Sequence, residues 1–129
     1  MTVNGVNHVA IIASNLEKSK NFYITKLGLK PIFELDRPDK KSTIVYLNAG
    51  NIIIELFSFP NPPKRLSWPE ACGLRHLAFT VDDVEATVTT PKGRGIESEP
   101  IRIDSRTGKK MTFIKDPDDL PIEITESRS

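Results

Sequence analysis

The chain has 129 residues, enough for one compact domain but few for two independent ones. Its 18 Lys and Arg residues nearly balance 17 Asp and Glu residues, and a formal charge of +1 excludes the broad basic surface that nucleic acid requires. No apolar run approaches the roughly 20 residues that span a bilayer, so we expect no membrane partner. Without a signal-like N-terminus, and with Cys72 as the single cysteine, the chain is expected in the cytoplasm.

The first half of the chain predicts a strand, a helix and three further strands. Residues 6–13 alternate as a strand does, and Ser14-Asn15-Leu16-Glu17 has the form of a capping box that opens a helix. The helix is expected to run to about Leu27, because Gly28 suits its C-terminal end. The strands that follow are predicted at residues 30–35, 43–48 and 52–58.

The second half repeats this order after a proline-rich linker at residues 59–74. A strand at 76–81 precedes a helix opened by Asp82 or Asp83, which should end near residue 90 because proline follows at position 91. Three more strands are predicted at 98–103, 109–115 and 120–126. The sequence therefore predicts an α+β fold of two tandem βαβββ modules, residues 5–58 and 75–127, within a single domain 1–129.

The two halves match each other at a constant offset. Residues 7–17, NHVAIIASNLE, align with residues 75–85, RHLAFTVDDVE, and place His8 over His76, which is 68 residues later. Residues 52–57, IIIELF, align with residues 120–125, LPIEIT, and place Glu55 over Glu123 at the same offset of 68. An internal duplication is the simplest interpretation.

Alternation along the strands places these four residues on equivalent faces. In the first strand Val9, Ile11 and Ala13 form an apolar face, and His8 lies on the opposite one. The other three strands show the same arrangement, and the residues opposite their apolar faces are Glu55, His76 and Glu123. Taken singly, a strand histidine is more often a structural residue and a strand glutamate is more often solvated. The repeated pairs instead predict one divalent first-row metal ion, for which nickel, zinc, cobalt, manganese and iron are all suited.

The chain resembles the vicinal oxygen chelate superfamily, also called the glyoxalase–bleomycin resistance–dioxygenase family, and glyoxalase I (lactoylglutathione lyase) in particular. The resemblance rests on the paired modules, on the positions of the four residues above, and on the segments FYITKLGLK and DPDDLPIEI. It covers nearly the whole chain. It implies a curved mixed sheet that cups the metal, with His8, Glu55, His76 and Glu123 as ligands, and a homodimer.

The same resemblance implies lyase or isomerase chemistry on a small-molecule substrate. A proton would move within a hemithioacetal, or a related α-oxygenated carbonyl compound, through a metal-bound enediolate. Glu123 would be the principal base and Glu55 its counterpart in the other module. Two alternatives remain: a non-catalytic module that binds a small molecule such as an antibiotic, and an extradiol-type dioxygenase. The latter relatives typically have no carboxylate at the position of Glu55.

Three positions depart from the glyoxalase I pattern. Ile12 stands where that enzyme usually has an arginine that anchors glutathione, and Phe59 stands where it has an asparagine. Phe57 and Phe59 are instead expected to form an apolar wall. Asp119 replaces a turn glycine, and aspartate tolerates the left-handed backbone conformation. Most of the chain's basic residues in this region are interpreted as solvated surface charges, although some of them could hold an anionic substrate: Lys64, Arg65, Arg75, Arg102, Lys109 and Lys110.

Overall fold

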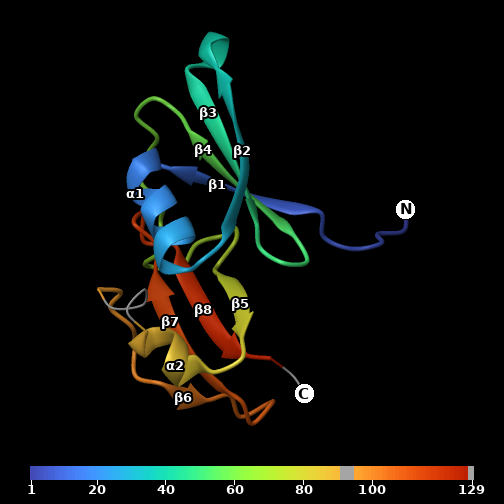
Figure 1. Ribbon diagram of the computed structural model, residues 1–129, viewed down its shortest axis with the longest axis vertical. Coiled ribbons are helices and arrows are strands. Elements are labelled where there is room, and N and C mark those ends of the chain that lie inside the picture. Colours follow the sequence, from blue (N-terminus) through green and yellow to red (C-terminus); the bar gives the residue numbers. More distant parts are fainter. Residues whose placement is uncertain (91–94, 128–129) are drawn as a thin grey trace. The chain divides into compact units, whose positions relative to one another are not determined.

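A computed structural model describes residues 1–90 and 95–127 (Figure 1). The chain divides into two compact units, Met1–Lys64 and Arg65–Ser129. Each unit contains one four-stranded mixed sheet and little helix, which confirms the predicted α+β fold in two tandem modules. Within the described residues, no helix is long and apolar enough to cross a membrane.

The sheet of the first unit has the strand order β1-β4-β3-β2. Strand β1 (His8–Ala13) pairs in parallel with β4 (Ile53–Ser58), while β3 (Ser42–Asn48) pairs antiparallel with both β4 and β2 (Lys30–Arg37). A short 3-10 helix, η2 (Pro38–Lys40), joins β2 to β3 at the tip of the hairpin seen in Figure 1. This parallel pairing places β1, which carries His8, beside β4, which carries Glu55.

The helix between β1 and β2 begins one residue later than predicted. Helix α1 (Leu16–Lys20) is capped by Asn15, whose Oδ1 accepts a hydrogen bond from the Lys18 backbone N–H at 3.1 Å. Ser14 is therefore not its N-cap, because Asn15 holds the extended backbone that a capping residue needs. The helix continues as a π-helix, η1 (Asn21–Lys26), rather than as an α-helix. Gly28 follows with φ +80°, which confirms the predicted end.

The second unit has the equivalent strand order, β5-β8-β7-β6. Strand β5 (Leu77–Val81) pairs in parallel with β8 (Pro121–Glu126), which pairs antiparallel with β7 (Lys110–Lys115). Helix α2 (Val84–Thr89) is capped by the Asp83 side chain, the second of the two predicted candidates, and ends at the predicted point. Pro91, expected to terminate it, lies outside the described residues.

The strand predicted at residues 98–103 is much shorter in the structure. Strand β6 covers Arg102–Ile103 alone, because Pro100 has no N–H to donate to a sheet. Glu99 nevertheless stays beside β7, since its backbone N–H donates to the Phe113 carbonyl at 2.9 Å. The turn before β8 contains Asp119 at φ +64°, which confirms the left-handed conformation expected there.

Burial follows the predicted alternation in all four strands that carry the repeated residues. Ile54 and Leu56 are fully buried on either side of Glu55, and Ile122 is fully buried and Ile124 nearly so on either side of Glu123. Each carboxylate therefore lies on the face opposite the core of its own unit. The linker, residues 59–74, contains no strand or helix in the structure.

Candidate metal centre

The first unit brings His8 and Glu55 together. His8 begins β1, and Glu55 lies in β4 beside Ala10, two residues further along β1. Both side chains are on the same face of the sheet, and His8 Nε2 lies 3.3 Å from Glu55 Oε2. The Glu55 side chain is 14% exposed, whereas that of His8 is 45% exposed, so the pair lies in a shallow, accessible position.

The hydrogen bond made by Nδ1 of His8 determines whether its Nε2 has a free lone pair. His8 Nδ1 lies 2.7 Å from Asn7 Oδ1, and because an amide oxygen only accepts, Nδ1 must carry the hydrogen. The neutral ring then presents the Nε2 lone pair to a carboxylate oxygen at 3.3 Å. A proton or a metal ion can bridge two lone-pair-bearing atoms at this distance. This pair therefore fits a metal, with Asn7 orienting the ring.

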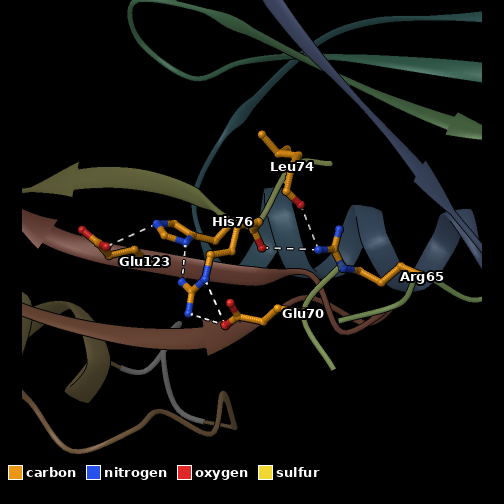
Figure 2. Close-up of polar contacts among 6 residues, drawn as sticks. Arg65, Glu70, Leu74, His76 and Glu123 are labelled. Carbon is orange, nitrogen blue, oxygen red and sulfur yellow. Dashed lines mark hydrogen bonds and ion pairs between the residues drawn. The ribbon is translucent and has the colours of Figure 1, made fainter. Parts of the chain in front are cut away.

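The second unit brings His76 and Glu123 together in the same way. His76 immediately precedes β5, and Glu123 lies in β8 beside Ala78. His76 Nε2 is 3.5 Å from Glu123 Oε1, and Figure 2 shows the two side chains turned toward each other. The two side chains are 27% and 18% exposed. The Phe113 ring meets the His76 ring edge-on, with centroids 5.1 Å apart, and supports it from β7.

A charged neighbour makes the second pair different from the first. Arg75 Nη1 lies 3.0 Å from His76 Nδ1, and because a guanidinium only donates, Nδ1 must accept and Nε2 must carry the hydrogen of the neutral ring. Arg75 is itself held by Glu70, with Nη2 2.9 Å and Nε 3.2 Å from Oε1. The hydrogen bond to Glu70 raises the pKa of Arg75, so Arg75 remains a cation. Binding a metal through His76 Nε2 thus requires Arg75 to leave Nδ1.

The structure therefore places the four predicted ligands as two His–Glu pairs, one in each unit. Among the described residues, no group of three or more His, Cys, Asp and Glu side chains is gathered as for a metal ion. That all four converge on one metal stays a prediction. Nitrogen and carboxylate oxygen donors in equal number are chemically suited to a divalent first-row metal.

Phe57 and Phe59 lie together as expected, but a cationic side chain lies over the two rings. Phe57 and Phe59 stack with centroids 5.8 Å apart, and the guanidinium of Arg37 lies 5.2 Å from one ring and 5.9 Å from the other. Ile12, paired with Phe57 across the sheet, is 54% exposed. Arg37 donates to Ser42 Oγ at 2.8 Å, yet its buried Nε has no hydrogen-bond partner among the described residues.

Arg37 was not singled out from the sequence. It stands next to Pro38 at the end of β2, where a basic residue is most simply interpreted as a solvated strand end. A usable signal did exist, because strand alternation from Phe33 through Leu35 puts Arg37 on the face of Tyr46, which pairs with Glu55.

The family model of the Glyoxalase/Bleomycin resistance protein/Dioxygenase superfamily matches residues 5–124, and the chain belongs to this superfamily. The uncharacterized protein YwkD of Bacillus subtilis is 50% identical over 127 residues, which are 98% of this chain and 99% of YwkD. Human mitochondrial methylmalonyl-CoA epimerase is 31% identical, over 95% of this chain and 73% of the epimerase.

A solved structure agrees closely with the fold. The glyoxalase family protein from Enterococcus faecalis is 47% identical and superposes with a TM-score of 0.86, over 98% of this chain and 100% of that one. The superfamily includes glyoxalase I, epimerases, fosfomycin resistance enzymes and dioxygenases. Its members are often enzymes, generally depend on a metal, typically bind small molecules and often form dimers.

Proposed function

We propose that the chain is a divalent-metal-dependent lyase or isomerase of the glyoxalase I kind, which moves a proton within a hemithioacetal or a related α-oxygenated carbonyl compound. The observation that carries this proposal is the pair of His–Glu contacts on equivalent strands of the two units. A single pair has an ordinary structural explanation. Two pairs at one sequence offset, each opposite a buried face, are better explained by a shared chemical role.

Four residues would hold the metal: His8, Glu55, His76 and Glu123. Nickel, zinc or cobalt suits this donor set best, with manganese and iron as alternatives. When bound, the metal would act as a Lewis acid that polarises the substrate carbonyl and acidifies the neighbouring C–H group.

The protein's own part in the reaction is to position the substrate and move the proton. We assign Glu123 as the principal base, which takes the proton from one carbon and returns it to the next, and Glu55 as its counterpart. Both carboxylates are mostly shielded, with 18% and 14% of their side chains exposed, yet both remain accessible to a substrate. Phe113 contacts the His76 ring and pairs with Glu123, and Phe57 lies two residues beyond Glu55 on β4; both rings would exclude water from the reacting carbons.

Epimerisation of a thioester is the second candidate, favoured by the identity to methylmalonyl-CoA epimerase. The chemistry is closely related, because a base removes a proton from the carbon next to a carbonyl and a proton returns to the opposite face of that carbon. Here Glu123 and Glu55, one in each unit, would act as the two proton carriers.

The decisive experiment is elemental analysis of the purified protein, followed by removal of the metal and reconstitution with nickel, zinc, cobalt, manganese or iron. The reconstituted protein is then assayed with methylglyoxal and glutathione, with methylglyoxal and other thiols, and for deuterium exchange at the α-carbon of methylmalonyl-CoA. We expect metal-restored activity in one arm. A protein that binds no metal would contradict the proposal and favour the non-catalytic binding module. Iron-dependent consumption of oxygen with a catechol would instead favour the dioxygenase.

Asn7 offers a test of the first half of the metal site. Its side chain fixes the His8 ring with Nε2 free to bind, so Asn7→Ala should lower metal affinity by roughly 10- to 100-fold. The measurement is competition against a chromogenic chelator. Asn4→Ala, three positions earlier on an exposed segment, is the matched control and should bind as the wild type does. Equal affinity in all three proteins would mean that Asn7 does not orient a ligand.

We further infer that the protein is a cytoplasmic homodimer. The edge strand β2 exposes Ile32, Phe33 and Leu35, which suits burial against a second copy. Cys72 is an exposed free thiol, which suits a reducing compartment. Light scattering should give twice the chain mass of 14.4 kDa, and a mass of one chain would contradict the dimer.

A further inference from the structure

A cavity of about 220 Å³ lies within the second unit, beside the His76–Glu123 pair. Two of its lining residues touch His76 directly: Arg75 through Nδ1 and Phe113 through the edge-on ring contact. The cavity is therefore adjacent to one half of the proposed metal site, and all of its walls come from residues 65–121.

The charge of the walls is predominantly positive. Four cations line the cavity, Arg65, Arg75, Arg102 and Lys115, against the carboxylates of Glu70 and Glu99. Glu70 pairs with Arg75 at 2.9 Å, and Glu99 with Arg102 at 3.6 Å. Within the described part of the chain, no ion pair is formed by Arg65 or by Lys115. Two positive charges on the cavity wall are thus left uncompensated.

Arg65 is also held rigidly in place. Its Nη2 donates to the backbone carbonyl of Leu74 at 3.0 Å, a contact drawn in Figure 2. Its Nε donates to Ser67 Oγ at 2.7 Å, and Nη2 also donates to the Arg75 carbonyl at 3.3 Å. These acceptors are neutral, so they fix the guanidinium without cancelling its charge. A pre-positioned cation binds an anion at a smaller entropic cost than a mobile side chain does.

The two existing ion pairs are weak enough to yield to a ligand. The Arg75 and Glu70 side chains are 61% and 55% exposed, and those of Arg102 and Glu99 are 57% and 53% exposed. Ion pairs at such exposed positions contribute little and are screened by salt. Arg102 also stacks over the Phe113 ring, 5.6 Å from its centroid, which keeps its guanidinium near the cavity.

We infer that this cavity binds an anionic group of the substrate, a carboxylate or a phosphate, and so directs the reacting carbons toward His76 and Glu123. This inference rests on the proposed function. It predicts an acidic substrate, such as a thiol adduct or a thioester in which the thiol component carries a carboxylate or a phosphate. It supplies, from the second unit, an anchor in place of the one that Ile12 cannot provide.

The experiment is a calorimetric titration of the protein as purified with three probes: inorganic phosphate, glutathione and coenzyme A. Phosphate tests the shared anion chemistry, and the other two separate a carboxylate source from a phosphate source. We expect phosphate to bind, one of the two thiols to bind more tightly, and both affinities to fall as salt is added.

Variants locate the binding. Arg102→Gln/Lys115→Gln should weaken binding of the preferred thiol at least 10-fold, and Arg65→Gln should do the same if it folds. Arg106→Gln removes one exposed arginine outside the cavity and should stay within twofold of the wild type. No binding of any probe, or equal affinity in the double variant, would overturn the inference. Because the titration measures neither metal content nor turnover, a protein that binds anions but no metal would refute the proposed function alone.

Discussion

Glu123→Gln is expected to abolish tight metal binding and to lower turnover by roughly 10²- to 10⁴-fold. The substitution keeps the shape of the side chain but replaces a carboxylate, which both binds a cation and accepts a proton, with a neutral amide that does neither well. Its neighbours on β8, Ile122 and Ile124, are buried on the other face, so the fold should be unaffected. Metal content by elemental analysis and kcat on the active substrate measure the two effects separately.

Two further variants make this prediction specific. His8→Ala removes a ligand from the other unit and should also abolish tight metal binding, because one metal is proposed to need both pairs. Glu97→Gln, an exposed glutamate in the same unit, should change neither metal content nor kcat. Tight metal binding in either Glu123→Gln or His8→Ala would refute the four-residue site. If Glu55→Gln reduced kcat more than Glu123→Gln did, the order of the two bases would be reversed.

The fold could be predicted well because the two halves of the chain repeat the same order of strands and helix. Strand alternation, the turn residues and the repeat at 68 residues agree with one another, and most predicted strands match within two residues. The differences have local causes. Pro100 shortens β6, Asn15 rather than Ser14 has the backbone conformation of a cap, and nothing in the helical periodicity distinguishes the π-helix η1 from an α-helix.

Only the positions of the site residues that lie on or next to strands could be predicted from the sequence. Alternation placed each His and Glu on the correct face, and the parallel pairs β1–β4 and β5–β8 bring each His to its own Glu. Contacts made by side chains from loops and strand ends could not be foreseen. An example is Arg75 on the His76 ring. Alternation gives the face on which Arg37 lies, but not its contact with the Phe57 ring.

The difference between the two pairs has a chemical consequence. Asn7 prepares His8 to bind a cation, whereas Arg75 holds the equivalent nitrogen of His76 as an acceptor. An anion in the adjacent cavity would compete for Arg75, and release of Arg75 would let the ring hydrogen of His76 move to Nδ1, so that Nε2 could bind a metal. The proposed anion site and the second half of the metal site are thus connected through one side chain.

Ile122→Ala is expected to lower the free energy of unfolding by about 2–5 kcal/mol. Ile122 is fully buried in β8, between Leu77 of β5 and Ile114 of β7, so that shortening its side chain leaves a cavity in the core. Urea unfolding followed by circular dichroism measures the change. Ile103→Ala, at a position 58% exposed on β6, removes the same atoms and should cost less than about 0.5 kcal/mol.

The same variant also separates stability from chemistry. Ile122 and Glu123 are adjacent in β8 but point to opposite faces, so the loss of core packing should leave the carboxylate in place while the protein remains folded. Metal affinity of Ile122→Ala, measured well below its unfolding transition, should therefore equal that of the wild type. A loss of metal together with a small change in stability would mean that β8 is not divided into a core face and a site face, and the assignment of Glu123 would fail with it.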